Sequence, residues 1–199
     1  MRIMLSLPVP LDPTDWIQLI VALFTGAAAW AAWASARASK RASEANLFSS
    51  LVAQYSAPEM LEALRALEQW RRSLTPDFTT GRRAGAGTYF EGNVRGWAKN
   101  ISSHDPSDQA QALNQQRRRV TQFFSLVARL IQEGELTAGF ADELRELSGR
   151  HILYQVAIPM ELALQEASAT SNVVAMHRLE RLRSVFFPDR PLPSLPPAT

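Results

Sequence analysis

The sequence contains no cysteine, so disulfides, thiolate metal sites and cysteine nucleophiles are excluded. Lysine is also scarce: apart from Lys40 and Lys99, all 21 basic residues are arginines. Because 19 acidic residues nearly balance them, the formal charge is only +2. The chain therefore lacks the cationic excess of a dedicated nucleic-acid binder, and we expect no nucleic-acid partner.

What the sequence does contain is enough apolar material for a folded domain. Of its 199 residues, 46% are hydrophobic, which is too many for a chain that is disordered throughout. The length indicates one domain with an appendage. A slightly negative mean hydropathy excludes a polytopic membrane protein, but one apolar segment stands out.

That segment is residues 16–36, WIQLIVALFTGAAAWAAWASA, which carry no charge. As a helix they span about 30 Å, the thickness of the hydrocarbon core of a bilayer. Tryptophans at both edges fit the aromatic belt of a membrane interface. We predict a transmembrane helix over 14–36, with a buried core helix as the alternative. The residues assigned to the span are Trp16, Leu19, Leu23, Gly26, Trp30 and Trp33.

The flanks of the segment predict its orientation. Arg37, Lys40 and Arg41 follow it, whereas two aspartates precede it and only Arg2 argues the other way. Basic residues stay on the cytoplasmic side. We expect a bacterial inner membrane protein with residues 1–13 as a short tail outside and the rest in the cytoplasm.

A cleaved signal peptide is the alternative, because Ala34-Ser35-Ala36 fits the small-residue pattern of a cleavage site. Cleavage would export everything from Arg37 onward. The apolar run is longer than in most such signals, and its start is acidic instead of basic. We therefore expect the span to be retained.

The predicted spanning helix has no sequence signal to end it early. Neither glycine nor proline occurs between Gly26 and Pro58, so we expect the helix to continue as a stalk to Tyr55. Ala22 and Gly26 form a small-xxx-small pair, which allows close approach of helices. Beside the lipid bilayer, the alternative partner of this segment is a second copy of the chain, packed through the small-residue face as a homo-oligomer.

Residues 37–187 show helical periodicity throughout, which predicts a cytoplasmic helical domain. A capping box at residues 56–59 starts one helix, and a long Gly-rich loop is expected over about 74–106. Further helices are predicted over about 106–133, 136–147, 151–167 with a kink at Pro159, and 172–187. Residues 188–199 form a Pro-rich extended tail. The predicted fold class is all-α. The apolar faces assigned to the helices are Leu47, Leu51, Val52 and Tyr55; Phe123, Phe124, Val127 and Leu130; and Val173, Met176, Leu179, Leu182 and Phe186.

No set of residues predicts catalysis. The histidines are scattered, so no metal site or cofactor is expected. Carboxylates in the helices are interpreted as solvated partners of arginine, and the Arg117-Arg118-Arg119 run as a solvated rim. The residues weighed for these roles are His104, His151, His177, Glu143, Glu146, Glu161, Glu166, Arg145 and Arg150.

The order of the anchor, LVAQYSAPEMLEALRALEQW at 51–70, RRRVTQFFSLVARLIQEGEL at 117–136 and AIPMELA at 157–163 resembles a loosely defined group of bacterial single-pass membrane proteins. The resemblance covers roughly residues 14–187. It implies a membrane location and a cytoplasmic helical domain, and no catalytic or binding residues.

Two functions remain open. The first is a membrane-anchored interaction or scaffolding module that places a protein partner at the cytoplasmic membrane face. The second is an enzyme acting on a membrane-proximal substrate, which a pocket joining Tyr89 or Trp97 with His104 and buried carboxylates would favour. We lean towards a protein that is not an enzyme.

Overall fold

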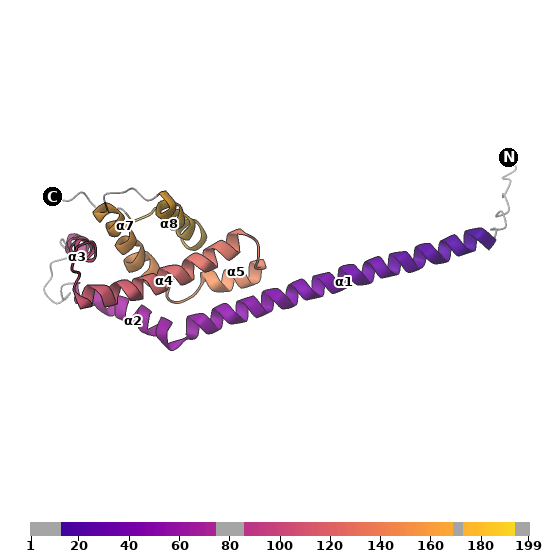
Figure 1. Cartoon of the computed structure of the whole chain (residues 1–199), viewed down its shortest axis with the longest axis horizontal. Helices are drawn as coiled ribbons and strands as arrows, with labels where there is room; N and C mark the ends of the chain where they lie inside the picture. The colour runs from indigo at the N-terminus through magenta and orange to yellow at the C-terminus, as the bar shows by residue number, and fades with distance from the viewer. Residues whose placement is uncertain (1–12, 75–85, 169–172, 194–199) are drawn as a thin grey trace, which may run out of the picture. The chain divides into compact units, whose positions relative to one another are not determined.

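The computed structural model describes the backbone of residues 13–74, 86–168 and 173–193 (Figure 1). All regular structure in these ranges is helical, so the predicted all-α class is confirmed. The chain divides into two compact units, residues 1–46 and residues 47–199. The first unit contains most of helix α1, and the second contains the end of α1 and the remaining helices.

Helix α1 (Pro13–Ser56) begins at a proline, whose missing N–H costs nothing at a helix start. It runs unbroken to Ser56, as the absence of glycine and proline after Gly26 predicted. Its end belongs to the second unit, where Leu51 and Tyr55 are buried. Val52 is 36% exposed, so its predicted place on the buried face is wrong.

Helix α2 (Pro58–Ser73) follows after a single residue. The predicted capping box is wrong: Ala57 is the N-cap, and no side chain caps the helix. Pro58 fixes the backbone of the first turn instead, which starts the helix without a side-chain cap. The helix buries one apolar face, formed by Met60, Ala63, Leu64 and Leu67.

Helix α3 (Ala86–Ile101) occupies about half of the region where a Gly-rich loop was predicted, so that prediction is wrong there. Val94, Trp97 and Ala98 are buried at spacings of three and four residues. Their packing outweighs the helix cost of the glycines, about 1 kcal/mol each. Residues 75–85 of the predicted loop lie outside the described residues.

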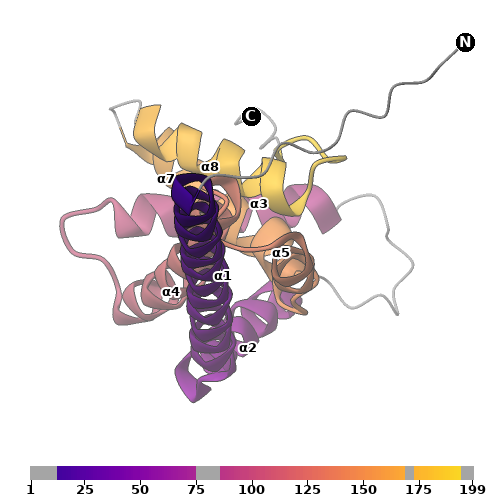
Figure 2. The same cartoon turned by 90° about the vertical axis from the view of Figure 1, so that its right-hand side faces the viewer.

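Helix α4 (Asp108–Gln132) lies at the centre of the second unit. The Ser107 side chain caps it by accepting a hydrogen bond from the backbone N–H of Ala110. It ends before Gly134, whose φ of +70° suits glycine. Figures 1 and 2 show α2 on one side of α4 and α8 on the other. The predicted core is confirmed: Phe123, Phe124 and Val127 are buried, and Leu130 packs against them.

Helix α5 (Ala138–Arg145) packs through Phe140, whose ring stacks on Phe48 at 4.5 Å between centroids. The turn after it includes Gly149, whose backbone N–H donates to the Tyr55 hydroxyl at 2.8 Å. A Cβ at Gly149 would lie 2.9 Å from Leu64 and from that hydroxyl. Only glycine fits this close approach.

The predicted 151–167 helix consists of three pieces: α6 (Arg150–Ile152), a π-helical turn (Leu153–Ala157) and α7 (Ile158–Ala167). The π-helical turn ends two residues before Pro159, which has no N–H to donate to the preceding turn. Most of α7 is buried, including Met160 and Ala163.

Helix α8 (Val173–Phe186) buries Leu179, Leu182 and Phe186, as predicted. Val173 and Met176 are exposed, so the predicted apolar face is wrong over the first turn. Beyond α8, the Tyr154 hydroxyl donates to the Pro191 carbonyl at 2.9 Å. Residues 194–199 of the predicted tail lie outside the described residues.

Candidate functional site

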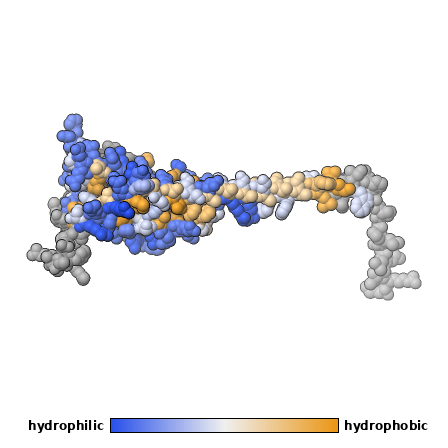
Figure 3. All heavy atoms as spheres, turned by 90° about the horizontal axis from the view of Figure 1, so that it is seen from below, coloured by the Kyte–Doolittle hydropathy of each residue, from blue (hydrophilic) through white to orange (hydrophobic). Residues whose placement is uncertain are grey.

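The first half of α1 presents apolar side chains outward along several turns. Trp16, Leu23, Trp30 and Trp33 are all exposed, and Phe24 is 74% exposed. Figure 3 shows this part of the helix with an orange and pale surface. Nothing lies within 4 Å of a Cβ at Gly26. The side chain of Leu19, also assigned to the span, lies outside the described residues.

The polar groups of this segment are few. The Thr25 hydroxyl donates to the Val21 carbonyl at 2.8 Å, within the helix itself. The Arg37 guanidinium lies 5.2 Å from the centre of the Trp33 ring, a cation–π contact at the end of the apolar run. Within the described ranges, no helix is both long enough and apolar enough to cross a membrane. The transmembrane assignment therefore stays a prediction.

A buried ion cluster joins three helices of the second unit. Glu161 of α7 pairs with Arg117 of α4 and, at 2.9 Å, with Arg178 of α8. Arg117 is 4% exposed, and the Asn114 side chain accepts two further hydrogen bonds from it. Burial lowers the pKa of the Arg117 guanidinium, and the Glu161 carboxylate opposes this shift. The cluster has two guanidiniums for one carboxylate.

This cluster corrects two predictions. Arg117 is not part of a solvated rim, although Arg118 and Arg119 are exposed, and Glu161 is not a solvated carboxylate. Helical position alone did not show this, because the partners are far apart in the sequence and meet only in the folded bundle. Glu166 does match the expectation, because it is exposed and pairs with Arg95 at 3.0 Å.

The pocket that would have favoured an enzyme is not assembled from the described residues. Trp97 is buried, donates its indole N–H to the Ala110 carbonyl at 3.2 Å and lines a hollow between α3 and α4. Neither His104, which is exposed, nor any carboxylate lines that hollow. The side chain of Tyr89 lies outside the described residues. Among the residues that the structure describes, no group of three or more metal-ligating side chains is found.

A hollow of about 810 Å³ lies between the start of α6 and the end of α8. Its charges are mixed, and its arginines are engaged: Arg150 pairs with Glu146 at 2.8 Å, and Arg190 lies over the Tyr154 ring. Aromatic Phe186 and Phe187 form part of its wall. Because both signs of charge line this hollow, it selects no particular ligand.

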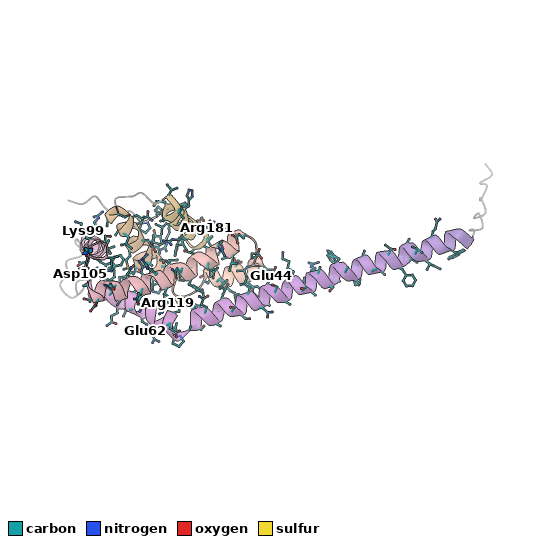
Figure 4. The ribbon with its side chains drawn as sticks, viewed as in Figure 1. Glu44, Glu62, Lys99, Asp105, Arg119 and Arg181 are labelled. Carbon is teal, nitrogen blue, oxygen red and sulfur yellow. The ribbon has the colours of Figure 1, made fainter. Side chains whose placement is uncertain are left out.

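Two other hollows flank the exposed face of α4 and share Gln122 and Leu126. One, of about 490 Å³, lies towards the corner between α1 and α2 and includes Arg118 and Arg119. The other, of about 400 Å³, lies between α4 and α8 and includes Arg181. Figure 4 labels Arg119 on α4 and Arg181 on α8. No acidic side chain lines either hollow, so this face of the second unit is basic.

Comparisons of the chain with protein-family models, curated protein sequences and solved structures found no match. We therefore infer the function from the sequence and the geometry of the described residues.

Proposed function

We propose that this protein is a single-pass, membrane-anchored helical module. Residues 14–36 hold it in a bacterial inner membrane with the N-terminus outside, and the helical second unit binds a protein partner at the cytoplasmic face. The observation that carries the proposal is the uncharged first half of α1, whose large apolar side chains are exposed.

The apolar side chains of the run contribute favourably to insertion, and the Gln18 amide opposes it. Six Leu, Ile, Val and Phe residues lie between positions 17 and 24. At about 0.5 kcal/mol each, they contribute about 3 kcal/mol to insertion. The alanines add little, and no charge opposes insertion. Thr25 reduces its own cost by bonding to Val21 within the helix.

The C-terminal edge of the run has the composition of a membrane interface. Trp30 and Trp33 precede Arg37, and the Arg37 guanidinium lies over the Trp33 ring. Tryptophan prefers the headgroup level, and a cation beside it is retained on the cytoplasmic side. Lys40 and Arg41 follow within about one turn, so the proposed orientation places the second unit in the cytoplasm.

A binding role fits the second unit better than catalysis does. Its buried carboxylate, Glu161, is neutralised by two arginines, and His104 is exposed. A membrane tether raises the effective concentration of a weak binding domain near its target, so modest contacts suffice. Protein that copurifies with the full-length chain from mild detergent identifies the partner.

Alkaline carbonate extraction of membranes tests the anchor. Wild type should remain in the membrane pellet, because carbonate releases only peripheral proteins. The double variant Leu23→Arg/Ala27→Arg should be released, because two charges cost about 5–7 kcal/mol and exceed what the apolar residues supply. The control Ala42→Arg/Asn46→Arg adds the same charges at the same spacing beyond the span, at exposed positions, and should stay in the pellet.

Release of wild type would contradict the anchor. If released wild type then runs as an oligomer in light scattering, a second copy of the helix covers the apolar side chains instead. Equal retention of the Leu23→Arg/Ala27→Arg variant would likewise show that residues 14–36 do not hold the chain in the membrane.

A further inference from the structure

The hollow between α4 and α8 is formed by matching faces of the two helices. Each helix contributes residues at positions i, i+3, i+4 and i+7, which lie on one face of a helix. We call this site the α4–α8 hollow. Its lining residues are Gln122, Ser125, Leu126 and Arg129 of α4 and Val174, His177, Arg178 and Arg181 of α8.

The charges of the α4–α8 hollow are of one sign. Three arginines and a histidine line it, without an acidic residue. Among the residues that the structure describes, no carboxylate pairs with Arg181, and Arg129 has only a loose contact to Glu133 at 3.8 Å. Arg178 shares Glu161 with the buried Arg117. The guanidiniums therefore outnumber the carboxylates available to them, and an anion in the hollow would relieve their repulsion.

Two hydrogen-bonding groups of the lining residues are left without partners in the described part of the chain. The Ser125 hydroxyl is buried and makes no hydrogen bond, and neither does the Arg178 Nε–H. Other helical hydroxyls, such as those of Thr121 and Ser184, donate to a carbonyl one turn back. A buried polar group without a partner costs about 1–3 kcal/mol, so its presence needs a reason.

We propose that the α4–α8 hollow binds a phosphate-type oxyanion. Arg129, Arg178 and Arg181 supply charged donors, and rotation of the Ser125 side chain about χ1 turns its hydroxyl into the hollow as a neutral donor. A phosphate group has three acceptor oxygens and a charge near −2, and the guanidinium fork matches its geometry. All these groups can donate, so a ligand made of acceptors satisfies them together.

The oxyanion has two chemical sources: a free phosphate or the headgroup of a phospholipid. Val174, which lines the hollow, is 78% exposed, and its neighbour Val173 is exposed as well. Apolar side chains beside a basic site suit a lipid, whereas a free phosphate needs none. This site does not rest on the proposed anchor, because it lies entirely in the second unit.

Titration calorimetry of the full chain in neutral nonionic micelles tests the site with two probes at constant ionic strength. One probe is inorganic phosphate, and the other is phosphatidic acid mixed into the micelles, with phosphatidylcholine, whose zwitterionic headgroup has no net charge, as its comparison. Wild type should bind at least one of the two phosphate probes. Binding of inorganic phosphate assigns a free phosphate as a source, and binding of phosphatidic acid alone assigns the lipid.

The variant Arg129→Gln/Arg181→Gln should weaken binding about tenfold or more, because it removes two charged donors without touching the buried cluster. The control Arg118→Gln/Arg65→Gln removes the same charge from exposed arginines outside the hollow, and binding should change by less than about threefold. No binding of either probe by wild type would overturn the proposal. An equal loss in the control would do so too, because it would show general charge attraction only.

The variant Ser125→Ala gives a second readout. It should weaken binding while leaving the melting temperature of the free protein unchanged or higher, because it removes an unpartnered buried hydroxyl and improves helix propensity. A drop in melting temperature with unchanged binding would show that Ser125 serves the fold and not the ligand.

Discussion

Replacing Glu161 by glutamine isolates the role of the buried ion cluster. The change keeps the size of the side chain but removes its charge, which leaves Arg117 buried without a carboxylate. Breaking a buried pair in this way costs about 3–5 kcal/mol. Asn114 still accepts hydrogen bonds from Arg117, and the Trp97 ring remains 5.9 Å from its guanidinium. We therefore expect a loss of about 3 kcal/mol in the free energy of unfolding.

Removing the arginine of the pair should lower the free energy of unfolding by less. Arg117→Met leaves Glu161 paired with Arg178, so no buried charge is orphaned, and we expect a loss of about 1 kcal/mol. The double variant Arg117→Met/Glu161→Met should fall within about 1 kcal/mol of wild type, because apolar side chains fill the site and Arg178 is exposed enough to turn to water.

Urea denaturation of the full chain in nonionic micelles, followed by near-ultraviolet circular dichroism, measures these differences. Glu166→Gln is the matched control, because this carboxylate lies on the same helix but is exposed, and its removal should cost less than about 1 kcal/mol. The reasoning is refuted if Glu161→Gln costs no more than Glu166→Gln, or if Arg117→Met/Glu161→Met loses as much as Glu161→Gln and Arg117→Met together, about 4 kcal/mol.

Three further predictions concern stability. Phe124→Ala should lower the free energy of unfolding by about 3–5 kcal/mol in the same assay, because Phe124 is fully buried; an unchanged value would mean that this ring does not pack in the core. Hydrogen bonding from Arg71 lowers the pKa of Glu68 to about 2, so its carboxylate stabilises the fold above the unfolded pKa and loses this effect as pH falls towards 2. In the Glu68→Gln variant, the melting temperature should depend less on pH below about 5 than it does in wild type. The same pH dependence in both proteins would contradict this prediction. Gly96→Ala should raise the free energy of unfolding by about 0.5–1 kcal/mol, because nothing lies within 4 Å of a Cβ at this position in α3. Gly149→Ala should lower it, because the added Cβ clashes with Leu64 and the Tyr55 hydroxyl. A change of the same sign in both variants would contradict these predictions.

The sequence predicted those elements whose signal is local. Helix α4 was predictable because Val120, Phe123, Phe124 and Val127 repeat at helical spacing and Gly134 ends the run. Helix α3 was not, because its glycines predict a loop and its buried face becomes visible only when the bundle packs against it. The spacing of Val94, Trp97 and Ala98 was the available signal.

The candidate sites differ in the same way: one has a local sequence signal, and the others form only when the helices pack. The uncharged run in α1 is read directly from composition, because every residue that matters is adjacent in the chain. Glu161 meets Arg117 across 44 positions, and no pattern within either helix indicates that pairing. The α4–α8 hollow likewise exists only because Arg129 and Arg181 come from helices that pack side by side.

Cysteine labelling of the full chain in intact cells tests the membrane anchor most directly, because the natural sequence contains no cysteine and each introduced thiol is unique. With a membrane-impermeant maleimide, the anchor predicts that Ser6→Cys reacts from outside and that Ser43→Cys reacts only after lysis. Ala28→Cys should stay unlabelled in both cases until detergent dissolves the membrane, because a thiol in hydrocarbon does not ionise. Labelling of Ala28→Cys after lysis without detergent, as fast as Ser43→Cys, would show that this segment lies in water and would contradict the anchor.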